Sequence, residues 1–111
     1  MRYPQGAVVF AEDPFKDGNA GRPWLIANTD AMPFHREQPI ALTLTTKTWY
    51  DDRIPIDPDM VIEGSLPRES SILPWAVASI NAQAISTTLA QLDNQVVDGA
   101  IEQLGTYLGI Q

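Results

Sequence analysis

Cysteine is absent from the 111-residue sequence, and histidine occurs only once. Without cysteine the chain forms neither a disulfide nor a thiolate metal site, and a single histidine excludes a multi-histidine metal site within one chain. No apolar run approaches the roughly 18 to 20 residues that a membrane-spanning helix needs, and no segment resembles a signal peptide. We therefore expect a cytoplasmic protein.

Positive charge is also scarce. Fourteen Asp and Glu residues outnumber five arginines and two lysines, which gives a formal net charge of −7 and a pI near 4.3. This balance resembles that of halophile proteins from salt-rich cytoplasm, and it is equally compatible with an ordinary acidic mesophilic protein. Nucleic-acid affinity comes largely from Lys and Arg that neutralise phosphates, so the charge excludes indiscriminate nucleic-acid binding. Any nucleic-acid activity must rest on a local site.

Short β-branched and apolar stretches, separated by turn residues, predict a mainly β fold. The expected strands are 6–11, 24–28, 40–47, 53–56, 60–63, 70–80 and 85–92. In 40–47, apolar and hydroxyl side chains alternate, which predicts a strand that is buried on one face only. A helix is expected to follow the last strand, so the order predicts one domain, 1–111, folded as a small, strongly curved β-barrel with a C-terminal α-helix.

The longest expected strand, 70–80, contains a proline. Because proline cannot donate to a sheet ladder, we expect a bend or bulge at Pro74. Ile72, Val77 and Ile80 are predicted to lie in the core.

The terminal helix is predicted from its ends and its periodicity. Asp93 is a good N-cap for 94–108, where apolar residues repeat at three- and four-residue steps, and Gly109 is placed to end the helix. Gly99 and Gly105 lie inside it, which indicates either close packing or a helix of modest stability.

A glycine-punctuated loop precedes the second expected strand. Gly18 and Gly21 permit a tight turn, and Pro23 suits the first position of a strand. Arg22 is therefore held at a rigid corner where the loop meets the sheet. Taken alone, the pattern fits a solvated arginine as well as a functional one.

Two other groups of polar residues are candidate sites. His35, in a loop bounded by prolines, would titrate near neutral pH as a general base, or is simply solvated. Four aspartates, 51, 52, 57 and 59, do not have the spacing of a calcium loop, and the acidic surface already explains them. A metal-dependent hydrolase built on them stays only as a third alternative.

Four sequence blocks lie in order along nearly the whole chain. They are Gly6-x-Val8-Val9 with Asp13-Pro14, Gly18, Arg22-Pro23-x-Leu25-Ile26, Asn28 and Asp30; Thr43-Leu44-Thr45-Thr46-Lys47; Glu69-Ser70-Ser71-Ile72-Leu73; and Leu89-Ala90-Gln91-Leu92-Asp93 with Leu108-Gly109-Ile110. Together they resemble the MazF/PemK family of toxin endoribonucleases, the toxins of type II toxin–antitoxin systems.

The resemblance implies an SH3-like barrel with a C-terminal helix, usually a homodimer, that a small cognate antitoxin holds inactive. It implies cleavage of single-stranded RNA, without metal or cofactor, by attack of the ribose 2′-hydroxyl on the adjacent phosphorus. The family's paired arginine and threonine correspond to Arg22 and Thr45. A guanidinium clamps the extra charge of a phosphorane, and a fixed hydroxyl positions or relays a proton.

The resemblance also implies an RNA groove around this pair. Its expected lining is Phe15, Lys16, Trp24, Asn28, Thr46 and Lys47, with Phe15 or Trp24 stacking on a splayed base. Stacking tolerates salt better than phosphate contacts do, which suits an acidic protein.

The sequence departs from the family pattern in three places. Ala76-Val77-Ala78 stands where the family often carries a Gln-x-Arg pair, Thr43 replaces a proline, and the loop before the second strand is shorter than in many members. A single transition-state donor is worth roughly 10²- to 10³-fold in rate. A non-catalytic module of the same barrel, binding RNA or a protein partner, is therefore the alternative to a nuclease.

Overall fold

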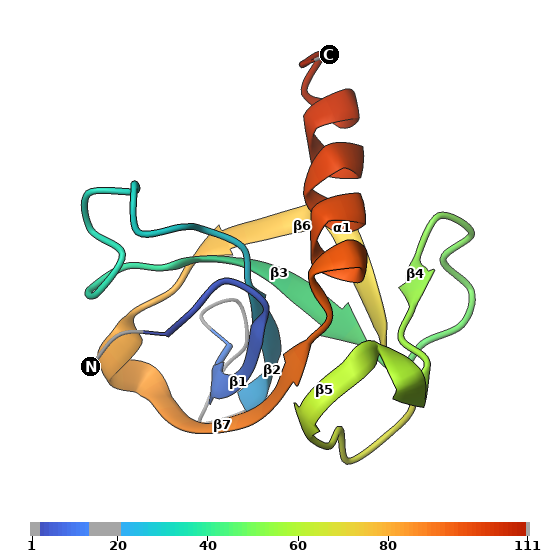
Figure 1. Ribbon diagram of the computed structural model, residues 1–111, viewed down its shortest axis with the longest axis horizontal. Helices are drawn as coiled ribbons and strands as arrows, with labels where there is room; N and C mark the ends of the chain where they lie inside the picture. The colour runs from blue at the N-terminus through green and yellow to red at the C-terminus, as the bar shows by residue number, and fades with distance from the viewer. Residues whose placement is uncertain (1–2, 14–20, 111) are drawn as a thin grey trace.

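The computed structural model describes residues 3–13 and 21–110 as a curled antiparallel sheet packed against one helix (Figure 1). Within these residues the sheet has seven strands in the order β4-β6-β3-β2-β1-β7-β5. The elements are β1 (Ala7–Glu12), β2 (Gly21–Ile26), β3 (Ile40–Thr45), β4 (Ile54–Pro55), the 3₁₀ turn η1 (Pro58–Met60), β5 (Val61–Gly64), β6 (Ser71–Ser79), the 3₁₀ turn η2 (Ala82–Ala84), β7 (Ile85–Leu92) and α1 (Asn94–Tyr107). The predicted mainly β barrel with a C-terminal helix is confirmed.

The centre of the sheet separates two apolar clusters. Val8, Leu25 and Leu42 are paired neighbours on β1, β2 and β3, and they face Val97 and Ala100 of α1. The opposite face carries a second cluster, made of Ala7, Val9, Ala11, Trp24, Ile26, Ala41 and Ile80. The central strands are therefore covered on both faces, and burial of this apolar surface is the main stabilising term of the fold.

Strand β3 is accordingly buried on both faces, whereas its alternating sequence predicted burial on one. Thr43 and Thr45 share the face of Ala41, and they are 9% and 7% exposed. The Thr43 hydroxyl donates to the carbonyl of Ala76 at 3.0 Å, which satisfies it in that buried position. A polar side chain in a strand thus marks the solvent face only when no other element covers it.

Strand β6 bulges as the proline predicted. Its register against β3 shifts between Leu42 and Thr43, so that the segment around Pro74 loops out of the ladder. One prediction on this strand is wrong. Val77 was expected in the core but is 45% exposed. The register pairs it with the buried Leu42, so it lies on the same face of the sheet, at a position that no other element fully covers.

Helix α1 begins and ends as predicted. The Asp93 carboxylate accepts a hydrogen bond from the Gln95 amide at 3.1 Å, and Gly109 adopts a left-handed φ of +83° just past the last turn. The C-terminal half of the helix projects beyond the strands (Figure 1). Among the described residues no helix is long and apolar enough to cross a membrane.

Candidate functional site

The corner that holds Arg22 is built from three neighbouring strands. Trp24 pairs with Thr43, and two further steps of the same antiparallel register set Arg22 opposite Thr45. The Arg22 guanidinium Nη2 donates to the carbonyl of Leu44 at 2.8 Å. The structure therefore brings together the arginine and the threonine that the sequence comparison paired.

Asp13, just past the end of β1, contacts the other side of the guanidinium. Arg22 Nη1 lies 3.2 Å from Asp13 Oδ2, and the two side chains are 27% and 2% exposed. A carboxylate this deeply buried fixes the direction of the guanidinium, because leaving either charge unpaired there is costly. Arg22 is thus partly accessible to a ligand, while its contacts with Asp13 and the Leu44 carbonyl set the orientation of the guanidinium.

Trp24 supports the arginine instead of binding RNA. The Arg22 guanidinium carbon lies 5.8 Å from the centroid of the Trp24 ring, within range of a cation–π contact. The ring is only 1% exposed, and its Nε1 is 3.4 Å from the Ala11 carbonyl. The prediction that Trp24 stacks on a base is therefore wrong, because the ring faces the second apolar cluster.

Thr45 ends β3 with its hydroxyl held by the turn that follows. Its Oγ1 accepts a hydrogen bond from the Lys47 amide at 3.1 Å, a local turn that threonine commonly makes. Thr46 and Lys47 are exposed directly beyond it, and the Lys47 ammonium lies 5.2 Å from the centroid of Trp49. These two residues thus lie beside the Arg22 and Thr45 pair, where the sequence comparison put the groove.

Asn28 does not join this group. It follows Arg22 by six residues, roughly 20 Å along an extended strand. Its Oδ1 accepts from the Ile40 amide at 2.9 Å, and its Nδ2 donates to the Thr29 carbonyl at 3.1 Å. The side chain connects the end of β2 to the start of β3, so the structure gives it an architectural role in place of the predicted RNA contact.

The other predicted site residues either lie outside the described part of the chain or lie away from the Arg22 corner. Phe15 and Lys16 lie outside the described residues. His35 has Nδ1 2.9 Å from the Met32 carbonyl, in the loop between β2 and β3, and not at the Arg22 corner. Within residues 3–13 and 21–110, no three carboxylate or imidazole side chains gather to hold a metal ion, so Asp51 and its acidic neighbours do not assemble the metal site considered as the third alternative.

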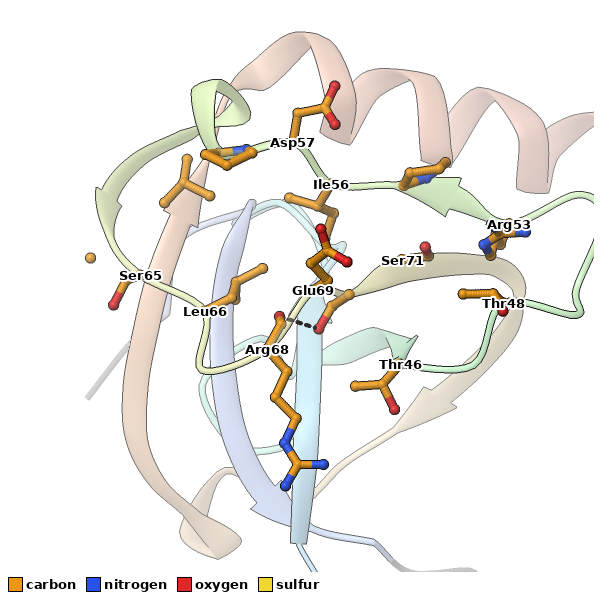
Figure 2. A pocket seen from close by; sticks show the side chains of 15 residues that line it. Thr46, Thr48, Arg53, Ile56, Asp57, Ser65, Leu66, Arg68, Glu69 and Ser71 are labelled. Atoms are coloured by element: carbon orange, nitrogen blue, oxygen red, sulfur yellow. Dashed lines mark hydrogen bonds between the residues drawn. The ribbon is translucent and has the colours of Figure 1, made fainter.

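Two parts of the site were not predicted. The first is Asp13, which is 2% exposed and for which the sequence signal is an Asp directly before a proline at the end of an expected strand. The second is a pocket of about 450 Å³ that opens beside Thr45 (Figure 2). Ser71, which is paired with Thr45 in the sheet, lines it together with Arg53 and Arg68.

Fold and corner together define a small, curled SH3-like barrel with a C-terminal helix and an arginine–threonine pair at the strand ends. Solved structures similar to this chain include MazF toxins and endoribonucleases. MazF from Deinococcus radiodurans has a TM-score of 0.78 at 16% identity, over 99% of both chains. An endoribonuclease in complex with its cognate antitoxin, from Mycobacterial species, has a TM-score of 0.72 at 20% identity, over 98% of this chain and 95% of that one.

The Mycobacterium tuberculosis toxin MazF-mt6 has a TM-score of 0.69 at 15% identity, over 95% of this chain and 98% of that one. No protein-family model and no curated protein matches the sequence. The chain therefore has the MazF fold, and its elements correspond to those of these proteins over nearly their full lengths.

Proposed function

We propose that the chain is a toxin of the MazF/PemK family, an endoribonuclease that cleaves single-stranded RNA without metal or cofactor. The observation that carries the proposal is the fixed Arg22 guanidinium beside Thr45, held by Asp13 and by the Leu44 carbonyl. The description of two solved structures of this fold, both from Mycobacterial species, as endoribonucleases supports it.

The reaction takes place at one phosphate of the RNA, where negative charge increases in the transition state. Attack of O2′ on phosphorus forms the O2′–P bond and breaks the P–O5′ bond, through a phosphorane that carries extra negative charge. Arg22 stabilises that charge by charge-assisted hydrogen bonds, and its preset orientation means that little reorganisation is needed during the reaction. The Thr45 hydroxyl positions or relays the proton that moves from O2′ towards O5′. The products are a 2′,3′-cyclic phosphate and a 5′-hydroxyl end.

Growth of a host cell tests the biological role. Expression of the chain is expected to arrest growth, and the Arg22→Ala variant, made at the same level, is expected to allow it. Normal growth with folded, soluble wild-type chain present would contradict a toxin.

A homodimer is part of the same proposal. Trp75 and Val77 on β6 and Tyr107 at the end of α1 are 38%, 45% and 44% exposed, and the rings of Trp75 and Tyr107 lie 6.3 Å apart. Leu108 and Ile110 extend this surface, at 66% and 65% exposed. Grouped apolar side chains of this kind mark an interaction surface, and we assign it to a second copy of the chain.

We further propose that the chain is one cytoplasmic domain regulated by a small antitoxin. Complexes of an endoribonuclease with its cognate antitoxin, in the same fold, support the partner. The net charge of −7 supports activity in a salt-rich cytoplasm. The chain has only seven Lys and Arg residues, so little of its RNA affinity would come from phosphate contacts, which weaken as salt rises.

A further inference from the structure

Positive charge near the Arg22 corner has to come from outside β6. The positions of β6 that carry a Gln-x-Arg pair in the resembled family are alanine here, at 76 and 78. Among the other described cations, Arg36 lies in the loop between β2 and β3, the same loop as His35, and Lys47 follows Thr45 with its ammonium 5.2 Å from the Trp49 ring centroid. Arg53 and Arg68 both line the pocket beside Thr45.

The pocket lies where the curled sheet fails to close. Its edge strands β4 and β5 lie on the same side of the molecule (Figure 1), and Pro55 of β4 and Gly64 of β5 both line the pocket. Thr46 forms part of the wall, and its Cα is about 3.8 Å from that of Thr45 along the chain. Ser71, the partner of Thr45 in the sheet, lines the pocket as well, so a ligand in the pocket lies next to Thr45.

The two arginines are differently placed. Arg53 Nη1 donates to the Tyr50 carbonyl at 3.0 Å, which fixes this guanidinium at the pocket wall. Arg68 is exposed and makes no ion pair with any described residue. Figure 2 shows its guanidinium and Thr46 on one rim of the pocket, with Asp57 on the opposite rim.

The pocket suits an aromatic base and not a phosphate. Ile56 and Leu66 supply apolar surface inside it. The exposed carboxylates of Asp57 and Glu69 repel phosphate and accept hydrogen bonds from base amino groups. The volume of about 450 Å³ falls within the roughly 300–1,000 Å³ of small-ligand sites. The charges thus set the base inside and the phosphate at the Arg68 rim.

We propose that this pocket binds the nucleotide that adjoins the scissile bond, with its base inside and its phosphate on Arg68, and with Arg53 as the second cation. The inference rests on the proposed endoribonuclease function and names the part of the RNA that the site holds. Arg53 and Arg68 replace the positive charge that β6 lacks, which removes the main ground for a non-catalytic module.

Binding of RNA across a salt series tests the pocket. The Thr45→Ala chain, used to prevent cleavage, is titrated with a short fluorescein-labelled single-stranded RNA of mixed sequence at several KCl concentrations. Adding Arg68→Ala is expected to lower affinity about ten-fold. It should also make the plot of log affinity against log salt shallower by about 0.7, the value for one lost phosphate contact to a single strand. Arg68→Lys keeps the charge and should keep the slope.

Arg36→Ala is the matched control, because it removes an exposed arginine that does not line the pocket. It should leave the RNA affinity and the slope of log affinity against log salt close to those of the parent Thr45→Ala chain. Arg53→Ala, checked for folding by thermal unfolding, should lower affinity as Arg68→Ala does.

The outcomes separate this inference from the function on which it rests. If the wild-type chain cleaves RNA while Arg53→Ala and Arg68→Ala behave like Arg36→Ala, the pocket assignment is overturned and the nuclease stands. RNA binding that depends on Arg68 without cleavage by the wild-type chain supports the pocket and contradicts the nuclease. No RNA binding at any salt concentration overturns both.

Discussion

Arg22 is positioned by contacts from three parts of the chain: the end of β1, the end of β3 and its own strand. Asp13 and the Leu44 carbonyl hold two of its nitrogens, and its Nε is buried without an acceptor among the described residues. A guanidinium so constrained presents the same edge to every ligand. Lysine offers a single ammonium on a flexible stem and lacks the planar fork that reaches two separate acceptors while leaving a third edge for a ligand.

Asp13 is predicted to be a structural partner whose loss weakens both the fold and the site. Asp13→Asn keeps the shape but removes the charge that Arg22 faces, so urea unfolding should show a loss of about 1–3 kcal/mol. The free energy is limited because Arg22 is 27% exposed. Arg22→Met should lower the free energy of unfolding less in the Asp13→Asn variant than in the wild-type chain, since the two charges are coupled. Additive losses would contradict the ion pair.

The pairing of Arg22 with Thr45 came from the family resemblance, and their roles stay predictions. The structure supplies the contacts around them, because the Leu44 carbonyl and Asp13 both bind the Arg22 guanidinium. Trp24 was misassigned because the sequence does not say which face of the sheet a second cluster covers. Asn28 was misassigned because its hydrogen bond to Ile40 depends on the pairing of two strands.

The elements themselves follow closely from local pattern and turn chemistry. Strand β7 and the start of α1 agree with their predicted bounds, because alternation, Asp93 and the apolar repeat are all local signals. Strand β4 has two residues where four were predicted, since Pro55 limits pairing at an edge. The facing of β6 was not predictable past Pro74, because the number of residues in a bulge is set by its partner strand.

Helix α1 should tolerate, and gain from, a side chain at Gly99. A Cβ built there meets no heavy atom within 4 Å, so close packing does not explain this glycine. Gly99→Ala is predicted to raise the free energy of unfolding by up to about 1 kcal/mol, because alanine restricts the unfolded chain and favours the helix.

Gly109→Ala is the matched control for this prediction. Gly109 has a φ of +83°, where an L side chain is strained, so alanine should destabilise by about 1 kcal/mol or more although space is open there as well. Equal effects of the two substitutions in urea unfolding would contradict the account of the helix.

At the scale of the whole molecule, the apolar surface of β6 and α1 is expected to join two copies. Val77→Asp puts a charge at a position that is already 45% exposed, so the fold should survive while the dimer dissociates. Light scattering of the wild-type chain should give twice the chain mass, and that of the variant the chain mass. Ile62→Asp is the control, because Ile62 is 62% exposed but lies on β5. A monomeric wild-type chain would contradict the assignment.

The pocket also belongs to this scale, which is why the sequence did not reveal it. Its walls come from β4, β5 and the start of β6, and they meet only when the sheet curls round on itself. The composition of a chain of charge −7 could not show that two of the five arginines share one cavity beside Thr45.

RNA cleavage in the absence of divalent metal tests the central claim most directly. Purified chain is incubated with single-stranded RNA in high KCl with EDTA, and the new ends are identified by mass spectrometry. We predict discrete cleavage with 2′,3′-cyclic phosphate ends, reduced about 10²-fold or more in Arg22→Ala, Arg22→Lys and Thr45→Ala, each with an unfolding transition that shows it is folded. Undiminished cleavage in the Arg22 and Thr45 variants, or no cleavage by the wild-type chain, would contradict the account.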